Sequence, residues 1–418
     1  METERTMANI SRQAGVSEQN MQHYMSKSPW SGHRVIEKVA SDIVAHPYFA
    51  TDTVLLLDES ADDKAGKSSA GAGRQYNGRR GKVDMCQVGV FVSIAKQGMN
   101  CWIDGEIFIP EHWFDDVHTE LRAQVGIAEE RIFQTKPELG WDLIERAQAR
   151  GMPFTAVACD SLYGRSFWFR SQLATANIEY YADIPVNTKV YLSQPEIGIS
   201  TNKRGRKATI PRVLSPRAYR IDQLRQHPSL LWQSVTLRPS ERGMLTADFA
   251  RRRVWTVQED MTVTQEWLLI RRTGKKHTYS LSNAPTDIPL TTMAQRKSQR
   301  YFIERSNQDA KSEFGWDEFQ ATKFTAWEHQ LAMTILAQWF IVQTRLDWED
   351  HYARDPELLH HYETDVLPAL SVANVRALLR AALPLPQLSP AEATKLVVKH
   401  LDNRARSRQS RLRTRAGP

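Results

Sequence analysis

Two aspartates directly follow short apolar segments of the chain. Asp58 comes after residues 54–57 and Asp160 after residues 157–159, and both segments have the composition of buried strands. If these strands are parallel neighbours, about 4.8 Å apart, the two carboxylates project together at one end of a sheet. Two like charges that close are costly unless a cation lies between them, and oxygen ligands favour Mg²⁺ or Mn²⁺. The pair therefore predicts a divalent-metal site, against the alternative that each acid only caps a helix.

The predicted helix 291–315 carries a third acid, Glu304, between two cations. Arg300 lies four residues before Glu304 and Lys311 seven residues after it, so all three share one stripe of the helix. Glu304 could complete the metal site, with Arg300 and Lys311 holding DNA phosphates beside it. The same spacing also fits an ordinary salt-bridged helix on the surface, and the residues alone leave that alternative open.

The segment after Asp58 contains one half of a phosphate-binding loop. Gly66-Lys67-Ser68 matches the end of the motif G-x-x-x-x-G-K-[ST], but the first glycine would fall at Ala61. Residues 69–82 are rich in glycine, which does not fit the helix that must follow such a loop. We therefore predict no nucleotide cofactor, and a flexible basic loop beside the aspartate that lets a DNA strand approach.

The remaining apolar pattern predicts alternating strands and helices. Two strands, 85–96 and 99–110, flank the short turn Gln97-Gly98, as in a hairpin. Further predicted elements are a helix over 117–151, a strand over 154–161, a helix over 164–177 and a strand over 178–185. Antiparallel strands followed by helix–strand pairs predict an α/β fold, in which helices cover both faces of a mixed sheet.

Changes in composition divide the chain into six regions. They are a helical N-terminal region (1–50), the first part of the core (51–186), a β-rich basic insertion (187–290), the second part of the core (291–345), a helical region (346–402) and an arginine-rich arm (403–418). Residues 10–27 fit either a helix-turn-helix that binds DNA or a plain helical hairpin packed on the core. A cationic loop inside the insertion predicts DNA contacts at Lys203, Arg204, Arg206 and Lys207.

Positive charge is concentrated at the C-terminus. The chain has a net charge of +7, and the arm 403–418 holds six arginines and no acid. Such an arm favours a polyanion as partner, nucleic acid first. Three scattered cysteines without C-x-x-C spacing fit a reducing cytoplasm, and the polar N-terminus predicts no signal peptide. The longest apolar run, 331–342, is too short to span a bilayer and predicts a buried core helix.

Together these features resemble a known family. The order strand-Asp58, strand-Asp160, β-rich insertion and helix-Glu304 is similar to that of the DDE transposases of bacterial insertion sequences. The helix of Glu304 matches the R-E-K part of the family's motif, whereas Lys297 stands where a tyrosine is usual. Three further segments resemble one subgroup of these transposases: SPW (28–30), GRQYNGRRGKVDMCQVGV (73–90) and CDSLYG (159–164).

The resemblance implies an RNase H-like core and an enzyme that cleaves DNA at element ends and joins them to target DNA. It implies that Asp58, Asp160 and Glu304 are catalytic and hold two divalent ions, Mg²⁺ or Mn²⁺, about 3.5–4 Å apart. The expected partner is double-stranded DNA of the element ends and of the target, bound by a homodimer that associates with the bacterial nucleoid in the cytoplasm. Two alternatives remain open: a metal-dependent nuclease without strand transfer, and a non-catalytic DNA-binding protein.

Overall fold

The computed structural model describes residues 5–199, 209–240, 243–318, 320–361 and 369–382, together with positions 363, 365, 367, 391 and 398. Two predicted DNA-binding segments lie outside the described residues. They are the basic arm 403–418 and the cationic loop with Lys203, Arg204, Arg206 and Lys207.

Three helices open the described chain: α1 (Met7–Ala14), α2 (Glu18–Ser26) and α3 (Gly32–Ala45). Gly15 takes a left-handed conformation (φ 67°) that ends α1, and the Ser17 hydroxyl accepts the Asn20 N–H to start α2. The connection has three residues, as in a helix-turn-helix. The ring of His329 in α11 (Phe324–Asp347) lies within hydrogen-bonding distance of the Met25 and Trp30 carbonyls, so the end of α2 is docked on the core.

One ten-stranded sheet organises the core. Its first part consists of β1 (Val54–Asp63), β2 (Gly73–Asn77), β3 (Lys82–Lys96), β4 (Met99–Phe108), β5 (Ala156–Cys159) and β6 (Tyr180–Asp183). The order β4-β3-β1-β5-β6 combines antiparallel pairing of β1, β3 and β4 with parallel pairing of β1, β5 and β6. The predicted mixed α/β class is therefore confirmed, as is the hairpin at Gln97-Gly98, where both residues have positive φ.

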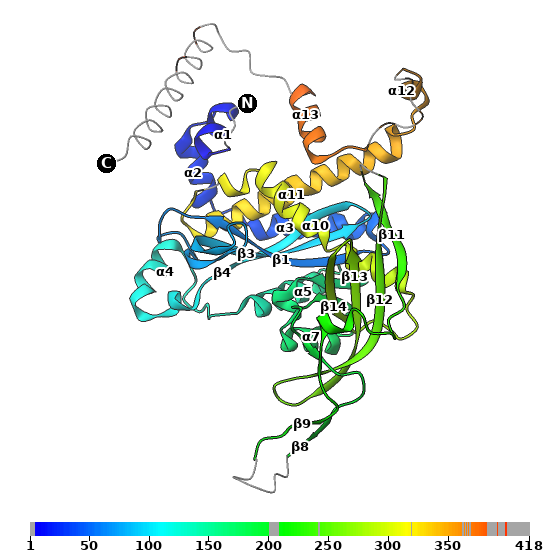
Figure 1. Cartoon of the computed structure of the whole chain (residues 1–418). Coiled ribbons are helices and arrows are strands. Elements are labelled where there is room, and N and C mark those ends of the chain that lie inside the picture. The colour runs from blue at the N-terminus through cyan, green and yellow to red at the C-terminus, as the bar shows by residue number, and fades with distance from the viewer. Residues whose placement is uncertain are drawn as a thin grey trace, which may run out of the picture.

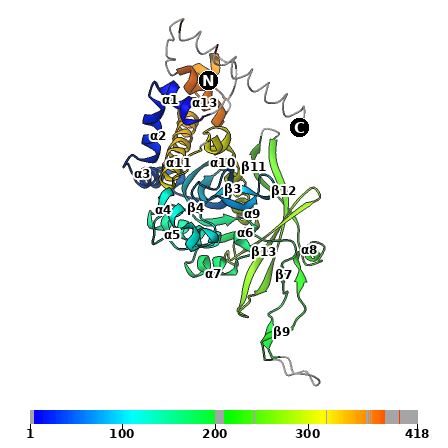
Figure 2. The same cartoon turned by 90° about the vertical axis from the view of Figure 1, so that its left-hand side faces the viewer.

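The β-rich insertion continues this same sheet. Its long strands are β11 (Gln233–Ser240), β12 (Gly243–Val257), β13 (Val263–Thr273) and β14 (Lys276–Ser282), and β14 pairs with β6 of the core. Two small two-stranded sheets pair β7 (Lys189–Val190) with β10 (Tyr219–Arg220) and β8 (Glu196–Gly198) with β9 (Arg212–Ser215). The short helix α8 (Ile221–Leu224) directly follows β10. In both Figure 1 and Figure 2 the insertion strands lie at the opposite side of the sheet from α4 (Thr119–Val125).

Side-chain alternation along β1 distributes the helices over the two faces. Leu55 and Leu57 pack with α5 (Lys136–Ala149) and α7 (Phe167–Thr175) in one core cluster. Val54 and Leu56 pack with α9 (Leu290–Ser298) and α10 (Tyr301–Ser312) in another. The remaining described helices are α6 (Ser161–Gly164), α12 (Pro356–His361) and α13 (Val372–Ala382).

Two predicted long helices are each broken in the structure. The helix expected over 117–151 is α4 and α5, because α4 ends at Gly126 in a left-handed conformation and Thr135 starts α5 with a capping box. The helix expected over 291–315 is α9 and α10. Between them the amides of residues 299, 300, 302 and 303 bond to carbonyls three positions back, which tightens the chain into a turn.

The predicted core helix 331–342 is the centre of α11, but it is buried on one side only. Leu331, Ile335 and Trp339 are buried, whereas Met333 and Phe340 are exposed. None of the described helices combines the length and the apolar composition that crossing a membrane requires.

A buried polar network ties the insertion to the core. Arg170 of α7 places Nε 3.1 Å from Oε1 of Glu266 in β13, and the two side chains are 7% and 1% exposed. The hydroxyls of Tyr180 in β6 and Thr256 in β12 each donate to Glu266 at 2.6 Å. Arg170 also donates to the carbonyl of Gly164, at the end of α6. Both carboxylate oxygens thus have partners, and these interactions offset the cost of desolvating the charge.

We expect Arg170→Met to destabilise the protein strongly, because Glu266 would stay buried without its cation. Breaking a buried pair from one side costs about 3–5 kcal/mol, to be measured by urea denaturation. The matched control is Arg220→Met, whose pair with Asp222 leaves the arginine side chain 50% exposed and contributes about 1 kcal/mol or less. Equal losses in the two variants would contradict the assignment.

Candidate active site

The register of the sheet brings Asp58 and Asp160 together. Leu57 of β1 pairs with Cys159 of the parallel strand β5, so the next residue of each strand is an aspartate at the same level. The strands differ from the prediction in one respect. Strand β1 does not end at Asp58 but continues along β3 to Asp63, whereas β5 ends and Asp160 caps α6 by accepting the Leu162 N–H at 2.8 Å. Only Asp160 therefore stands at a strand end.

A third carboxylate, Glu59, joins the two aspartates. One oxygen of each of Asp58, Glu59 and Asp160 lies within 4.8 Å of the others. Glu59 follows Asp58 in β1, which continues past this level, whereas β5 ends at Cys159 and the chain turns into α6. Oδ1 of Asp58 accepts the Glu59 N–H at 2.9 Å, and Lys136 Nζ lies 3.3 Å from Oε1 of Glu59. The prediction from the sequence did not include Glu59, although its place directly after Asp58 was a visible signal of a second acid at this point.

Burial makes this cluster electrostatically costly. Desolvation, and then the neighbouring carboxylate of Asp160, raise the pKa of Asp58 to about 8, although Arg300 acts in the opposite direction. Burial also raises the pKa of Glu59, against the effect of Lys136, and the pKa of Asp160, against its bond with the Leu162 amide. The hydroxyl of fully buried Tyr163 has no partner among the described residues, and these acids add to the burial that raises its pKa. Such a group of oxygen donors fits a hard divalent cation.

Arg300 connects Glu304 to the cluster. Its guanidinium lies 2.6 Å from Oε1 of Glu304, 4.0 Å from Oδ2 of Asp58 and 3.1 Å from Oδ2 of Asp183. The side chain of Glu304 is 55% exposed, whereas that of Asp58 is 16% exposed. The structure thus brings Glu304 to the rim of the site through an arginine, and Asp183, which ends β6, is a further acid that the sequence did not single out.

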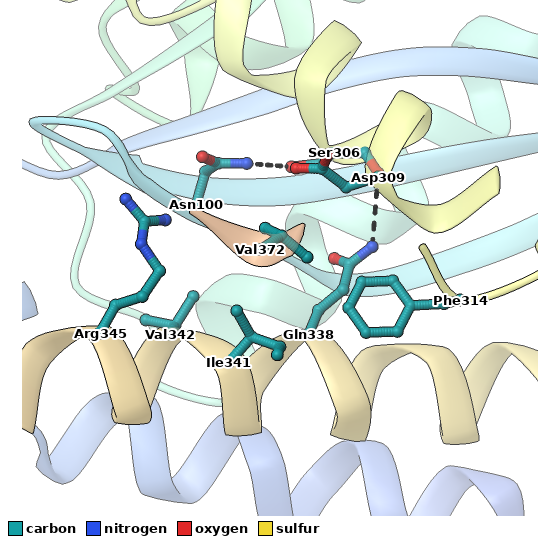
Figure 3. Close-up of a pocket in the computed structure, with 9 residues that line it drawn as sticks. All are labelled: Asn100, Ser306, Asp309, Phe314, Gln338, Ile341, Val342, Arg345 and Val372. Atoms are coloured by element: carbon teal, nitrogen blue, oxygen red, sulfur yellow. Dashed lines mark hydrogen bonds between the residues drawn. The ribbon is translucent and has the colours of Figure 1, made fainter. Parts of the chain in front are cut away.

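The inner face of α10 is held by polar contacts that orient Glu304 outward. Asn100 of β4 donates to the Ser306 hydroxyl at 2.6 Å, and Gln338 of α11 donates to the Ser306 carbonyl at 3.4 Å. Figure 3 shows these side chains facing one another across a small pocket. Trp102 adds a bond from Nε1 to Oδ1 of Asn307 at 2.9 Å. These contacts lie on the side of the helix that faces the sheet, so Glu304 remains on the exposed side.

Lys311 lies in a different environment from Arg300 and Glu304. Its ammonium is 3.1 Å from Oδ1 of Asp62 and donates to the Ala61 carbonyl at 2.6 Å, both in β1. Trp316 donates to the other oxygen of Asp62 at 2.5 Å. The Lys311 side chain is only 16% exposed and that of Asp62 7%. Lys311 therefore links the end of α10 to the strand that carries Asp58.

The glycine-rich segment after β1 is more structured than predicted. Residues 73–77 form β2, which pairs with β3. Gln87 donates to the Ala70 carbonyl at 2.6 Å, and Ala70 and Asn77 are completely buried. The predicted flexibility of the basic loop after Asp58 is therefore wrong for residues 73–77, because the sheet extends to them.

Comparison with known proteins places the chain in a family. A family model described as "DDE superfamily endonuclease" matches residues 1–244, more than half of the chain, and the chain belongs to this family. The mixed sheet is consistent with the RNase H-like fold of this family, and the insertion strands prolong it.

Among curated proteins, the chain is similar to a probable transposase for insertion sequence element IS701 from Microchaete diplosiphon. The two are 26% identical over 328 residues, which cover 77% of this chain and 73% of the relative. The family and this relative together support an enzyme of the transposase and endonuclease class.

We expect Lys311→Met to lower stability, because Asp62 would remain buried without its cation. The loss should be about 3–5 kcal/mol in urea denaturation, and part of it should return in the double variant Lys311→Met/Asp62→Asn. The control is Lys38→Met, whose pair with Asp42 leaves the lysine 73% exposed and should cost about 1 kcal/mol or less. Unchanged stability in Lys311→Met would mean that this ion pair is not a structural link.

Proposed function

We propose that this protein is the transposase of an insertion sequence, which cleaves DNA at the element ends and joins the ends to target DNA. The observation that carries the proposal is the pairing of β1 with β5, which sets Asp58 beside Asp160 within reach of the Arg300–Glu304 pair. The IS701 relative supports transposition over other DNA cleavage reactions. We further propose that the protein acts as a homodimer on double-stranded DNA.

Asp58, Asp160 and Glu304 are the proposed ligands of Mg²⁺ or Mn²⁺, with two ions expected. The oxygen-only cluster of Asp58, Glu59 and Asp160 supports this choice of metal. Bound divalent ions would activate the water or 3′-hydroxyl nucleophile and stabilise the leaving 3′-oxygen.

The protein's own residues prepare the site. Asp58 and Asp160 are held by β1 and by the start of α6, so neither carboxylate needs to reorganise greatly. Arg300 neutralises part of the acidic charge and keeps Glu304 at the rim, from where a rotation of the half-exposed side chain would bring its carboxylate inward. Arg300 is also the proposed contact to a DNA phosphate. Lys311 stays a predicted contact, although its ammonium is paired with Asp62.

We expect Asp58→Asn, Asp160→Asn and Glu304→Gln each to abolish Mg²⁺-dependent cleavage while largely retaining DNA binding. The amides keep the shape of the side chains but remove the charge that holds the metal ions. The measurement is nicking of a labelled duplex that carries the element end. Asp63→Asn is the matched control, because Asp63 lies on the same strand but is 43% exposed and paired with Arg80. Cleavage at the wild-type rate by Glu304→Gln would remove Glu304 from the site.

The same assay separates the proposed transposase from a nuclease. Incubation of cleaved ends with a supercoiled plasmid should give joined products only if the protein transfers strands. Metal-dependent nicking without any joining would favour the nuclease, and binding without nicking would favour a DNA-binding protein.

We expect Glu59→Gln to weaken metal binding, because Glu59 shares the cluster with both aspartates and its Oε2 is buried without a hydrogen-bond partner among the described residues. Mn²⁺ titration followed by electron paramagnetic resonance should show several-fold weaker binding than in wild type. Asp63→Asn again serves as control and should bind Mn²⁺ normally. If Glu59→Gln binds Mn²⁺ with wild-type affinity, then Glu59 serves only to hold Lys136.

A further inference from the structure

Two arginines of the insertion, Arg271 on β13 and Arg238 on β11, face the helices that carry Arg300 and Glu304. Arg271 of β13 lies opposite Thr278 of β14. Leu269, two residues before Arg271, lies opposite Ser280. The Ser280 hydroxyl donates to the carboxylate of Asp183 at 2.5 Å, and Arg300 is paired with this same carboxylate. Leu269 packs with residues of α9 and α10, so the face of β13 that carries Arg271 is turned towards these helices.

Arg238 reaches the same helices from β11, which is separated from β13 by β12. Its guanidinium lies 4.5 Å from the ring centre of Tyr301 and 5.2 Å from that of Phe302, at the start of α10. The Tyr301 ring is 46% exposed and directly follows Arg300 in the chain. Figure 2 shows α9 and α10 alongside the insertion strands, and α9 contacts both β11 and β12. A half-exposed surface of arginine and tyrosine therefore adjoins the catalytic rim.

This junction contains more positive than negative charge. Lys297 lies 3.0 Å and Arg300 3.1 Å from the same acid, Asp183. Arg271 interacts with the charges of both Asp183 and Arg238, so the four cations form one connected group, and Asp183 is not a proposed metal ligand. Arg300 also interacts with Asp58, Glu304 and Asp160, the three proposed metal ligands, whose charge would be taken up by bound metal ions.

Arg271 is the least satisfied of these cations. Its Nε is buried and has no hydrogen-bond partner among the described residues. Burial lowers the pKa of Arg271, with Asp183 opposing that shift and Arg238 adding to it. Burial likewise lowers the pKa of Lys297, which Asp183 opposes, and the charges of Arg300 and Arg271 add to the decrease. Partly buried like charges are costly, and an anion between them would offset that cost.

We propose that Arg238 and Arg271 form a phosphate-binding site for the DNA strand next to the cleaved phosphodiester, with Arg300 at its inner end. This inference rests on the proposed DNA-cleaving function and adds the surface that holds the substrate. A DNA backbone fits better than an isolated anion, because the cations extend from the catalytic rim over the insertion strands from β13 to β11, and the partly exposed Tyr301 lies against Arg238.

Adjacent arginines on β13 provide a matched test. Arg272 follows Arg271 but points to the other face, where it pairs with Asp248 at 3.0 Å and stacks on Trp232. We expect Arg271→Gln to weaken binding of a fluorescein-labelled DNA duplex in EDTA about tenfold or more. The slope of log affinity against log salt should become shallower by about 0.9 for this one phosphate contact. Arg272→Gln should change neither quantity appreciably.

If Arg271→Gln and Arg272→Gln weaken DNA binding equally, the effect is one of general surface charge. If Arg271→Gln does not change DNA binding, Arg271 does not contact DNA. Either outcome overturns the proposal. Circular dichroism melting checks that each variant folds. If Arg271→Gln does not fold, Arg238→Gln carries the test on the other side of the site, and an unchanged salt slope there also overturns it. Binding in EDTA requires no catalysis, so this result is independent of the cleavage test of the three acids.

Discussion

Repulsion among partly buried carboxylates is the constraint on which the centre of this structure depends. Asp58, Glu59 and Asp160 approach one another where β5 ends, and burial there raises the pKa of each. Two cations from other elements offset part of this repulsion. Lys136 of α5 is paired with Glu59, and Arg300, just before α10, lies near Asp58. A group of acids that needs compensating charge is also a group that can hold divalent cations, so the electrostatic cost of folding and the proposed chemistry have the same origin.

The helix that carries Glu304 is positioned by contacts on its other side. Asn100, Trp102 and Gln338 bind Ser306 and Asn307, and Lys311 attaches the end of α10 to Asp62. None of these contacts involves Glu304, which is free to stay at the solvent side. The arrangement separates the two roles of the helix, because packing sets its place while the exposed acid remains able to move.

The insertion is built into the sheet that carries the acidic cluster and is not an appended body. It prolongs the core sheet through the pairing of β14 with β6, and Glu266 joins it to Arg170, which in turn holds the end of the short helix that Asp160 caps. A buried ion pair of this kind makes displacement of either partner costly. Charge on the insertion strands is therefore held at a defined place relative to the acids, which is the condition for a substrate contact made from β11 and β13.

The sequence by itself determined the element types, the hairpin at Gln97-Gly98, the mixed α/β class and the family, because hydrophobic periodicity, turn residues and motifs are local properties of the chain. It also singled out Asp58, Asp160 and Glu304. Only the tertiary structure decided which side chains meet. Glu59 lies with Asp58 and Asp160 because β1 continues past the residue where β5 ends. Arg300 links Glu304 to Asp58 because a turn separates α9 from α10. Lys311 contacts Asp62 because α10 packs against β1. These meetings depend on the lengths and register of strands far apart in sequence, which no local pattern encodes.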